Sequence, residues 1–418
     1  MLASLGELSH KSRYNSSRRI GAFSWYTCVR ILYGEIDLTK KILLLMADTG
    51  GGHRSSTEAV LEAMRRRNIG DCEVEMVDVL GDYAPFPLNK LDALYPYMTR
   101  FSKVTWEPAY RLVNTPERAR FLVRTAWPIA QETARKVLVS HSADLIVSFH
   151  PLYNYALLWA KEKEKNDTPM ATMVTDMATI HALWCAPGMV RYMMPTRQAA
   201  RLAVGYGISR DKIDITGLPI SRRFAELTGR PNREVRRNLD LDPGLPTVLL
   251  MGGGQGMGRM YPIARALASI KMEFQLVIVA GRNPTLKLQL QLADWKIPVR
   301  IYGFTREVPV LMAASDVLVT KAGPSTVAEA LAMGLPMILS GYIPGQEDGN
   351  MKIVVHGKAG VYAPKPKQIA QTLREWLTPG STILGERARA ARKLGRPEAA
   401  ENVADIICKL AGCGECTA

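Results

Sequence analysis

Short apolar runs alternate with amphipathic stretches along most of the chain. The first run, at 41–46, reads KILLLM and is followed by three glycines and an amphipathic stretch from Ser55 to Arg67. A continuous apolar run is typical of a parallel strand that is buried on both faces. We therefore predict a strand, a glycine loop and a helix here, and further strands at 73–77, 144–148 and 170–174.

The same pattern begins again past the middle of the chain. TVLLM at 247–251 is followed by several glycines up to Gly258 and then by a predicted helix that ends near Ile270. Further apolar runs predict strands at 275–280, 299–302, 316–320 and 337–339. The 418 residues are also more than one hydrophobic core normally supports. The sequence therefore predicts an α/β fold with two Rossmann-like domains.

These repeats divide the chain into five segments. We predict a loosely ordered N-terminal extension at 1–38, a first domain at 39–220, a linker at 221–246, a second domain at 247–395, and a C-terminal helix and tail at 396–418.

The second domain contains the chemistry of a phosphate cradle. After the predicted strand at 316–320 the chain breaks at Gly323, and Ser325 and Thr326 are expected as N-cap residues of a helix. Free N–H groups at a helix start, with the positive end of the helix dipole, bind a diphosphate without any metal. Glu329, one turn later, would accept hydrogen bonds from the two hydroxyls of a ribose. The alternative is a capping box in which Glu329 bonds back to the cap.

A polar loop follows the next predicted strand. Between Gly341 and Asn350 it carries Gln346, Glu347 and Asp348. Loops at the carboxyl ends of parallel strands are where α/β proteins bind ligands, and this set suits the hydroxyls of a hexose. The alternative is a solvated turn that leads into another helix. The two loops together point to a nucleotide-sugar site.

Charge and hydropathy narrow the range of partners. The formal net charge of +15 predicts attraction to an anionic partner. No zinc-finger spacing or aromatic-rich RNA-binding pattern is present, so an anionic membrane surface is favoured and no nucleic-acid partner is predicted. The chain has no run of about eighteen uncharged apolar residues, so no membrane-spanning helix is predicted.

Between Pro85 and Val139, however, aromatic and leucine residues recur at helical spacing among arginines and lysines, which suits a helix in a membrane interface. The alternative is a core-facing amphipathic helix with a solvated basic side.

The N-terminal segment and the cysteines give only weak signals about function. Arginines flank the short stretch at 20–29, which is too short and too polar for a signal peptide, so residues 1–38 are expected as an extension that contacts membrane through Phe23, Trp25 and Tyr26. The six cysteines are dispersed, and one CxxC at Cys413 and Cys416 is a weak metal or redox signal. We expect a reduced chain.

A dinucleotide-binding enzyme is the alternative that the glycine loops raise. Neither loop is a clean GxGxxG, and no acidic residue ends the strand that follows the second loop, where Arg282 and Asn283 stand instead. The sequence therefore disfavours a nicotinamide cofactor.

A set of motifs in order along 41–377 closely resembles the monogalactosyldiacylglycerol synthases and diacylglycerol glycosyltransferases of glycosyltransferase family 28. The motifs are GGH at 51–53, HPL at 150–152, TDMATIH at 175–181, MGGGQGMG at 251–258, GRN at 281–283, DWKIPV at 294–299, TKAGPSTVAEA at 320–330 and GYIPGQEDGN at 341–350. The resemblance implies a GT-B fold, in which two facing Rossmann-like domains enclose an interdomain cleft. It also implies inverting, metal-independent transfer from a UDP-hexose to diacylglycerol, with no cofactor, at the cytoplasmic face of a membrane to which the protein binds peripherally.

The resemblance and the residue chemistry together suggest catalytic candidates. An inverting transfer needs a base for the acceptor hydroxyl, and His53, which follows the first glycines and opens a helix, is the best candidate. A histidine in such a place is otherwise a cap or packing residue. His150 and His181 are second-tier candidates, although His150 before a proline has a structural alternative. Asp176 would orient a base or the acceptor.

The donor-binding candidates lie in the second domain. They are Gly253, Gly254, Arg282, Gly303, Phe304, Gly323, Ser325, Thr326, Glu329, Gln346, Glu347 and Asn350. Backbone amides and Arg282 would hold the diphosphate, although a salt bridge at a strand end is the alternative for Arg282. Gly303 and Phe304 match where the family holds the uracil, and Gln346 and Glu347 would hold the sugar. Ser325 departs from the glycine that is usual in the plant-type synthases.

Two features of the family pattern do not carry over. The cysteine-rich insertion of the plant enzymes is absent, and Asp240 and Asp242 spell a DxD motif whose place in the linker favours a coincidence of surface charge.

Three functions remain open: a UDP-sugar:diacylglycerol hexosyltransferase that favours galactose over glucose by resemblance, a UDP-sugar epimerase of the same fold without a lipid acceptor, and a non-catalytic membrane-binding protein. The intact His53, Glu329 and Gln346-Glu347 set disfavours the third.

Overall fold

The computed structural model describes residues 39–48, 51–67, 72–86, 88–90, 107–229 and 232–413. The described helices and strands belong to one compact unit, Lys40–Ala418. The predictions made for 1–38, for the aromatic and basic residues within 91–106 and for Cys416 lie outside the described residues.

The first domain is built on a parallel sheet of six strands in the order β2-β1-β3-β4-β5-β6. The strands are β1 (Lys40–Met46), β2 (Cys72–Asp78), β3 (Leu145–Ser148), β4 (Met170–Met173), β5 (Arg191–Met194) and β6 (Ile213–Ile215). Its helices are α2 (Gly52–Arg66), α4 (Glu107–Val113), α5 (Pro116–Ser140), α6 (Asn154–Lys163) and α7 (Arg197–Gly205). The apolar run of β1 is buried from Ile42 to Met46 because helices cover both faces of the sheet.

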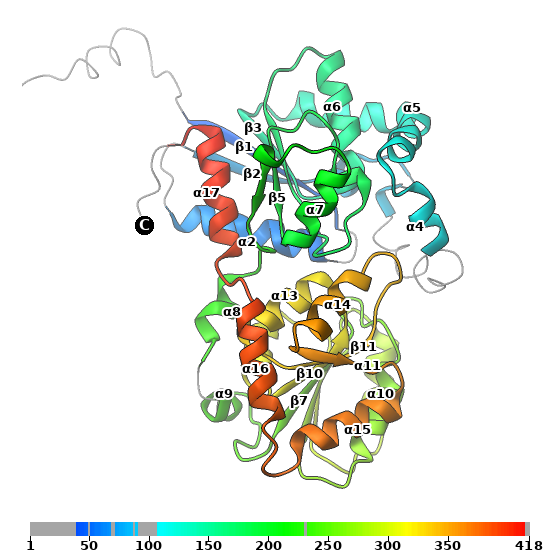
Figure 1. Cartoon of the computed structure of the whole chain (residues 1–418), viewed down its shortest axis with the longest axis vertical. Helices are drawn as coiled ribbons and strands as arrows, with labels where there is room; N and C mark the ends of the chain where they lie inside the picture. Colours follow the sequence, from blue (N-terminus) through cyan, green and yellow to red (C-terminus); the bar gives the residue numbers. More distant parts are fainter. Residues whose placement is uncertain are drawn as a thin grey trace, which may run out of the picture. The chain divides into compact units, whose positions relative to one another are not determined.

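The second domain repeats this architecture, with a parallel sheet in the order β12-β11-β10-β7-β8-β9 (Figure 1). The strands are β7 (Thr247–Met251), β8 (Gln275–Val279), β9 (Val299–Tyr302), β10 (Val317–Lys321), β11 (Met337–Gly341) and β12 (Gly360–Tyr362). The helices are α10 (Met260–Ala268), α11 (Pro284–Gln291), α12 (Val308–Ala313), α13 (Pro324–Met333), α14 (Asp348–His356) and α15 (Pro366–Leu377). The GT-B fold class predicted above is confirmed.

The strand order places the glycine loops where ligands bind. In each sheet the order reverses beside the first strand of that domain, because β1 lies between β2 and β3 and β7 lies between β8 and β10. Such a reversal opens a crevice at the carboxyl ends of the strands. The glycine-rich segments after β1 and β7 both begin at such a crevice.

The strands that the apolar pattern predicted are present, and three others were missed. The bounds predicted for β7 and β9 are correct, and those of the other predicted strands differ by one or two residues. The missed strands are β5, β6 and β12, each three or four residues long. The three-residue strands β6 and β12 give no pattern that stands out from a loop, and β5 begins with Arg191 rather than with an apolar residue.

The predicted linker contains two helices, α8 (Arg222–Leu227) and α9 (Asn232–Asn238). Phe224 is buried, and Arg236 forms an ion pair of 2.5 Å with Asp316 at the start of β10. The linker is therefore packed against the second domain. Asp242 closes a turn by accepting a hydrogen bond of 2.7 Å from the N–H of Gly244, as expected of a linker carboxylate rather than a diphosphate site.

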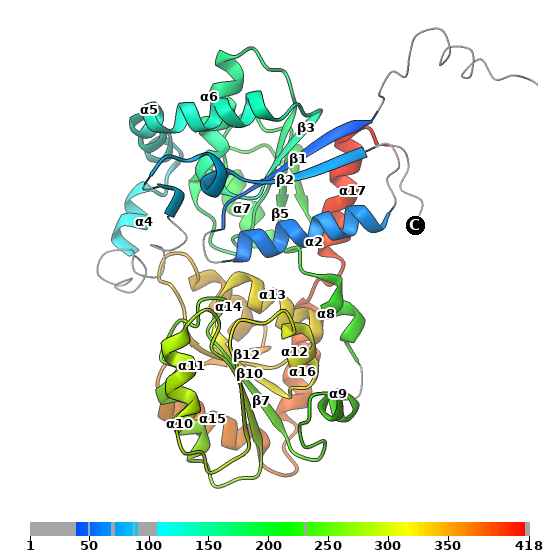
Figure 2. The ribbon, with the colours of Figure 1, turned by 180° about the vertical axis from the view of Figure 1, so that it is seen from behind.

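The chain returns to the first domain at its end. Helix α16 (Ile383–Leu394) packs against α13, and α17 (Ala399–Ala411) packs against α2 and against β1 and β3 of the first sheet (Figures 1 and 2). This return brings Cys413 to Cys72, and the two form a disulfide. The expectation of a fully reduced chain is wrong here, because residues 341 positions apart along the sequence meet only through the packing of α17.

The amphipathic segment at 85–139 has both a buried and an exposed apolar face. Helix α5 buries Ala119, Val123 and Val137 against the first domain. Trp127, one of its aromatic residues, also faces inward and packs against Trp159 with ring centroids 5.5 Å apart. On the outer side, large hydrophobic side chains are exposed at Phe86, Leu112, Phe121, Leu122, Ile129 and Val139.

Candidate active site

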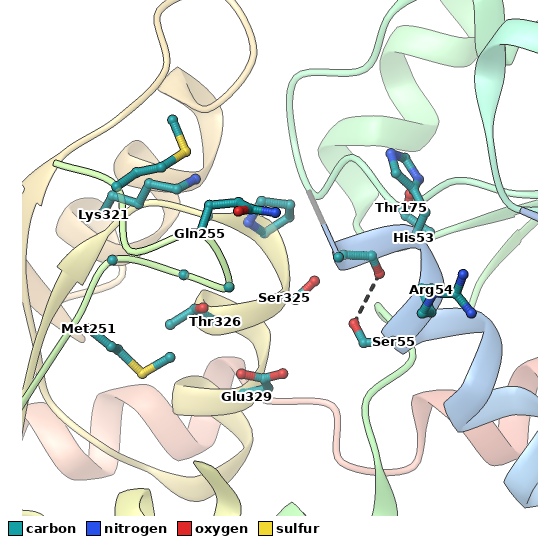
Figure 3. Close-up of a pocket in the computed structure, with 18 of the residues that line it drawn as sticks. His53, Arg54, Ser55, Thr175, Met251, Gln255, Lys321, Ser325, Thr326 and Glu329 are labelled. Atoms are coloured by element: carbon teal, nitrogen blue, oxygen red, sulfur yellow. Dashed lines mark hydrogen bonds between the residues drawn. The ribbon is translucent and has the colours of Figure 1, made fainter. Parts of the chain in front are cut away.

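A cavity of about 300 Å³ lies between the two domains. Its walls are the start of α2 in the first domain, and the glycine loop after β7, the start of α13 and the loop after β11 in the second (Figure 3). The cavity therefore lies where the strand reversals of both sheets face each other.

His53 projects from the first turn of α2 into this cavity. Its Nδ1 lies 2.9 Å from the carbonyl oxygen of Phe149 and 2.7 Å from Oγ1 of Thr175. A carbonyl only accepts hydrogen bonds, so Nδ1 carries the proton and Nε2 is the basic nitrogen. Burial lowers the pKa of His53 to about 4, against the opposing effects of the Phe149 carbonyl and Asp48. The ring is therefore neutral near pH 7, as a general base requires.

The other two candidate histidines lie outside the cavity lining. His150 and His181 each cap a short 3₁₀ turn, and their Nδ1 atoms accept hydrogen bonds from the N–H groups of Leu152 and Leu183. Burial lowers the pKa of both imidazoles. The ring of His150 packs against that of His53, with centroids 4.4 Å apart. Both histidines thus support the loops that contain them. For His150 this agrees with the alternative of a purely structural role.

Asp176 lines the cavity but does not hold His53. Its Oδ2 accepts a hydrogen bond of 2.7 Å from Trp184 Nε1, and its carboxylate also bonds to the side chain of Gln346 from the other domain. Burial raises the pKa of Asp176 to about 6, although both hydrogen bonds oppose the shift. The orientation of His53 that we expected from Asp176 comes instead from Phe149 and Thr175.

The glycine loop after β7 is tightly folded against β8. A Cβ at Gly256, where φ is +60°, would lie 2.0 Å from the carbonyl oxygen of Ala280, so only glycine fits. The loop brings the backbone of Gly253 and Gly254 to the cavity wall. The carbonyl of Gly254 accepts a hydrogen bond of 2.9 Å from the N–H of Arg282, which fixes the loop to the end of β8.

Arg282 and Phe304 form one side of the cavity. The guanidinium stacks over the Phe304 ring at 4.1 Å and has no carboxylate partner among the described residues, so the salt-bridge alternative is wrong. Phe304 is 53% exposed and lines the cavity. Gly303 follows β9 directly, next to Phe304, and is not itself among the residues that line the cavity.

Helix α13 begins two residues earlier than an N-cap at Ser325 would place it. Gly323 is the N-cap and Pro324 is the first helical residue, so Ser325 and Thr326 lie in the first turn and are not caps. Proline favours this start because its φ is already helical and it has no N–H to satisfy. The N–H groups of Ser325 and Thr326 have no partner in the described part of the chain, which suits an anion. Ser325 also faces the first domain, where a Cβ at Gly52 would lie 3.0 Å from its Oγ.

Glu329, one turn further along α13, lines the cavity. Its carboxylate has no hydrogen bond or ion pair among the described residues, and α13 has no side-chain cap, so the capping-box alternative is wrong. Burial raises the pKa of Glu329 to about 7. A desolvated carboxylate without donors is suited to accept hydroxyl groups from a ligand.

Lys321, which the sequence analysis missed, is a cavity-lining cation at the end of β10. Its Nζ bonds to Oε1 of Glu347, and it lies 3.1 Å from where a Cβ of Gly323 would be, next to the start of α13. The lysine directly after an apolar run and two residues before the N-cap glycine was the available signal. A cation at a helix N-terminus is unfavourable unless an anion joins it.

Glu347, in the loop after β11, lines the cavity and has partners within the second domain. It is 2% exposed, and while one oxygen bonds Lys321 the other accepts a hydrogen bond of 2.8 Å from the N–H of Ile343. Its contact with the sugar stays a prediction. Asn350 is buried outside the cavity lining and donates a hydrogen bond of 3.0 Å to the carbonyl of Ala322, so it supports the loop. Gln346 lines the cavity as predicted.

Two protein-family models match the chain. The model for monogalactosyldiacylglycerol (MGDG) synthase matches residues 53–220, and the glycosyltransferase family 28 C-terminal domain matches residues 247–403. The probable monogalactosyldiacylglycerol synthase 2, chloroplastic, of Oryza sativa subsp. japonica is 37% identical over 384 residues, covering 89% of this chain and 81% of that protein. Monogalactosyldiacylglycerol synthase 2, chloroplastic, of Arabidopsis thaliana is 34% identical over 420 residues, covering 97% and 89%.

Solved structures share the fold at much lower sequence identity. MurG of Acinetobacter baumannii aligns with a TM-score of 0.58 at 16% identity, covering 88% of this chain and 99% of that chain. A putative UDP-N-acetylglucosamine 2-epimerase from Listeria monocytogenes gives 0.58 at 12% identity, covering 89% and 96%. HepE of Anabaena, in complex with UDP and glucose, gives 0.53 at 14% identity, covering 88% and 100%. The fold is thus shared by transferases and epimerases and does not distinguish them.

Proposed function

Since this chain belongs to the monogalactosyldiacylglycerol synthase family and is a glycosyltransferase, we propose that it transfers a hexose from a UDP-sugar to the free hydroxyl of diacylglycerol with inversion at the anomeric carbon. One observation carries the proposal: the neutral His53 faces, across one cavity, the unpaired N–H groups at the start of α13. A base and an anion cradle on opposite walls are what a single displacement at a sugar diphosphate requires.

The second domain supplies the groups for the donor. The N–H groups of Ser325 and Thr326, with Lys321 and Arg282, would hold the diphosphate by hydrogen bonds and charge. Glu329 would accept the hydroxyls of the ribose. These groups need no metal to bind the two phosphates, which keeps the prediction of a metal-independent reaction.

The remaining parts of the donor would lie at the two ends of the cavity. The exposed Phe304 ring and the backbone of Gly303 suit the uracil. Gln346, held by Asp176, suits the hexose. Galactose is the hexose that the names of the relatives favour, and glucose differs from it by the orientation of one hydroxyl.

His53 would take the proton of the acceptor hydroxyl at Nε2. As the hydroxyl oxygen bonds to the anomeric carbon, the bond from that carbon to the diphosphate oxygen breaks, and its electron pair leaves with UDP. The imidazolium that forms keeps its Nδ1–H bond to Phe149, and the nearby Asp48 favours its charge. The backbone N–H groups of α13 and Lys321 stabilise the charge that develops on the diphosphate.

The acceptor would be reached at a lipid surface. The outer side of α4 and α5 exposes Leu112 and Phe121, at 62% and 69%, and this side carries arginines at 111, 118, 120 and 124. Exposed apolar groups among cations suit peripheral binding to an anionic membrane. Across the residues that the structure describes, no helix has the length and apolar character to cross a bilayer.

Purified protein, given diacylglycerol in anionic vesicles and either UDP-galactose or UDP-glucose, tests the proposal. We expect a monohexosyl lipid of inverted anomeric configuration from one donor, and its formation about a hundredfold or more slower in the His53→Ala variant. Epimerised or hydrolysed UDP-sugar without any glycolipid would contradict the lipid acceptor and favour the epimerase alternative, whose fold is also similar.

A further inference from the structure

Tyr110 of α4 packs directly on the loop that carries Gln346. Its Cδ1, Cγ and Cβ atoms lie 3.1, 3.6 and 3.7 Å from where a Cβ of Gly345 would be. Gly345 has φ of +85°, a conformation that side-chain-bearing residues rarely adopt. The Tyr110 ring thus covers the backbone directly before Gln346, and both views place α4 beside this loop (Figures 1 and 2).

The first domain holds the same loop at two further points. Asp176 bonds the side chain of Gln346, and Oγ1 of Thr179 accepts a hydrogen bond of 3.0 Å from the N–H of Gly349. The loop belongs to the second domain by sequence, yet side chains of the first domain contact it at Gly345, Gln346 and Gly349. Any shift of Tyr110 would therefore act on Gln346 before it acted on the diphosphate cradle.

Tyr110 is itself fixed on its inner side. Its ring packs edge-on against His181, with centroids 4.9 Å apart at 75°. Asn114, which follows α4, accepts a hydrogen bond of 2.7 Å from the N–H of Ala182. His181, which does not line the cavity, thus has a role in supporting the tyrosine that covers the donor loop.

The outer side of the same helix faces solvent. Leu112 is 62% exposed and the side chain of Arg111 is 69% exposed, within two residues of Tyr110. Arg118 of α5 donates a hydrogen bond of 3.0 Å to the carbonyl of Leu112, which joins the two helices. Four arginines (111, 118, 120 and 124) stand here against two glutamates (107 and 117), so the charge complements an anionic lipid surface.

We propose that Tyr110 is a positioning residue that couples the seating of α4 on an anionic lipid surface to hexose binding at Gln346. The inference rests on the proposed function, because it assumes a UDP-hexose donor and a membrane-borne acceptor. Coupling between two binding sites is reciprocal, so the lipid surface strengthens UDP-hexose binding and UDP-hexose strengthens lipid binding by the same factor. UDP lacks the hexose that Gln346 would hold, so its affinity should be insensitive to the coupling.

Calorimetric affinities for UDP-hexose and for UDP, with and without phosphatidylglycerol vesicles that lack diacylglycerol, test the inference on the full chain. For Tyr110→Ala we expect UDP-hexose affinity about tenfold weaker and UDP affinity unchanged. Vesicles should tighten UDP-hexose binding severalfold in the wild type and not in this variant. Tyr110→Phe, which keeps the ring, should behave as the wild type. Leu112→Ser should weaken vesicle binding while leaving vesicle-free UDP-hexose affinity unchanged.

Two outcomes would overturn the coupling specifically. Equal weakening of UDP and UDP-hexose in Tyr110→Ala would make Tyr110 a general packing residue, and an unchanged vesicle effect in that variant would show that the lipid acts by another route. A wild-type protein that binds UDP but no UDP-hexose, with or without vesicles, would overturn the proposed donor itself and is distinguishable from either outcome.

Discussion

The carbonyl oxygen of Phe149 lies 2.9 Å from Nδ1 of His53. Phe149 follows β3, whereas His53 opens the helix after β1, and the two strands are neighbours in the first sheet. The contact fixes the tautomer of the imidazole and leaves Nε2 as the basic nitrogen. The catalytic assignment of His53 depends on this relationship more than on its place beside glycines.

Replacing His53 with alanine should lower kcat by about 10²- to 10⁴-fold, which is the usual contribution of a general base. UDP affinity should not change, because the diphosphate cradle lies on the other domain. Because burial lowers the pKa of the imidazole to about 4, the wild-type kcat/KM should show no loss of this base between pH 8 and pH 5.5. An inflection near 6.5 that disappears in the variant would contradict the assigned pKa.

Glu329 should make UDP binding depend on pH. Burial raises its pKa to about 7 in the free protein, and the ionised carboxylate is the form that accepts both ribose hydroxyls. UDP affinity should therefore rise from pH 6 to pH 8, and binding at pH 7 should release about half a proton per site. Calorimetry in two buffers of different ionisation enthalpy measures that proton. Glu329→Gln should bind UDP more weakly at pH 8 and without this pH dependence, and a slope that persists in the variant would assign it to another group.

Lys321 should contribute to binding of the second phosphate. For Lys321→Met we expect UDP affinity about tenfold to a hundredfold weaker, since a lost charge-assisted contact is worth about 1.5–3 kcal/mol. UMP affinity should change less than twofold if the ammonium faces the terminal phosphate. Lys352→Met, an exposed lysine of α14 outside the cavity lining, is the matched control. An equal loss of affinity for UMP and for UDP would mean that Lys321 contacts the first phosphate instead.

Gly52 and Ser325 should show an interaction across the cavity. A Cβ at Gly52 would lie 3.0 Å from Oγ of Ser325, closer than such contacts normally come. Gly52→Ala should therefore lower kcat/KM severalfold by displacing α2 from α13, and Ser325→Gly in the same chain should restore it. A double-mutant cycle measures the coupling. Additive effects of the two substitutions would mean that the two residues do not touch during the reaction.

The disulfide between Cys72 and Cys413 should stabilise the return of α17 to the first domain. Removing such a cross-link typically lowers the free energy of unfolding by about 2–4 kcal/mol. Cys413→Ser should therefore unfold at lower urea than the wild type under non-reducing conditions. Reductant should remove the difference between them, and a wild type whose urea midpoint is insensitive to reductant would contradict the cross-link.

Much of the fold was predictable because it rests on local pattern. The apolar runs of β1 and β7 are long enough to predict buried strands, and the glycines after them indicate tight turns. The cavity residues His53, Arg282 and Glu329 were found in the same way, since each stands at a strand end or helix start whose chemistry is readable from its neighbours.

The sequence by itself thus determined two repeated α/β domains, the switch-point loops and the family to which the chain belongs. Only the tertiary structure decided which candidates share the cavity. His150, His181 and Asn350 lie outside its lining, and Glu347 bonds to Lys321. The tertiary structure also joined Cys72 to Cys413. The physical reason is that hydrophobic periodicity and secondary-structure propensity depend on residues that are neighbours in the sequence. Burial, tautomer and ion pairing instead depend on groups that the chain brings together from distant positions.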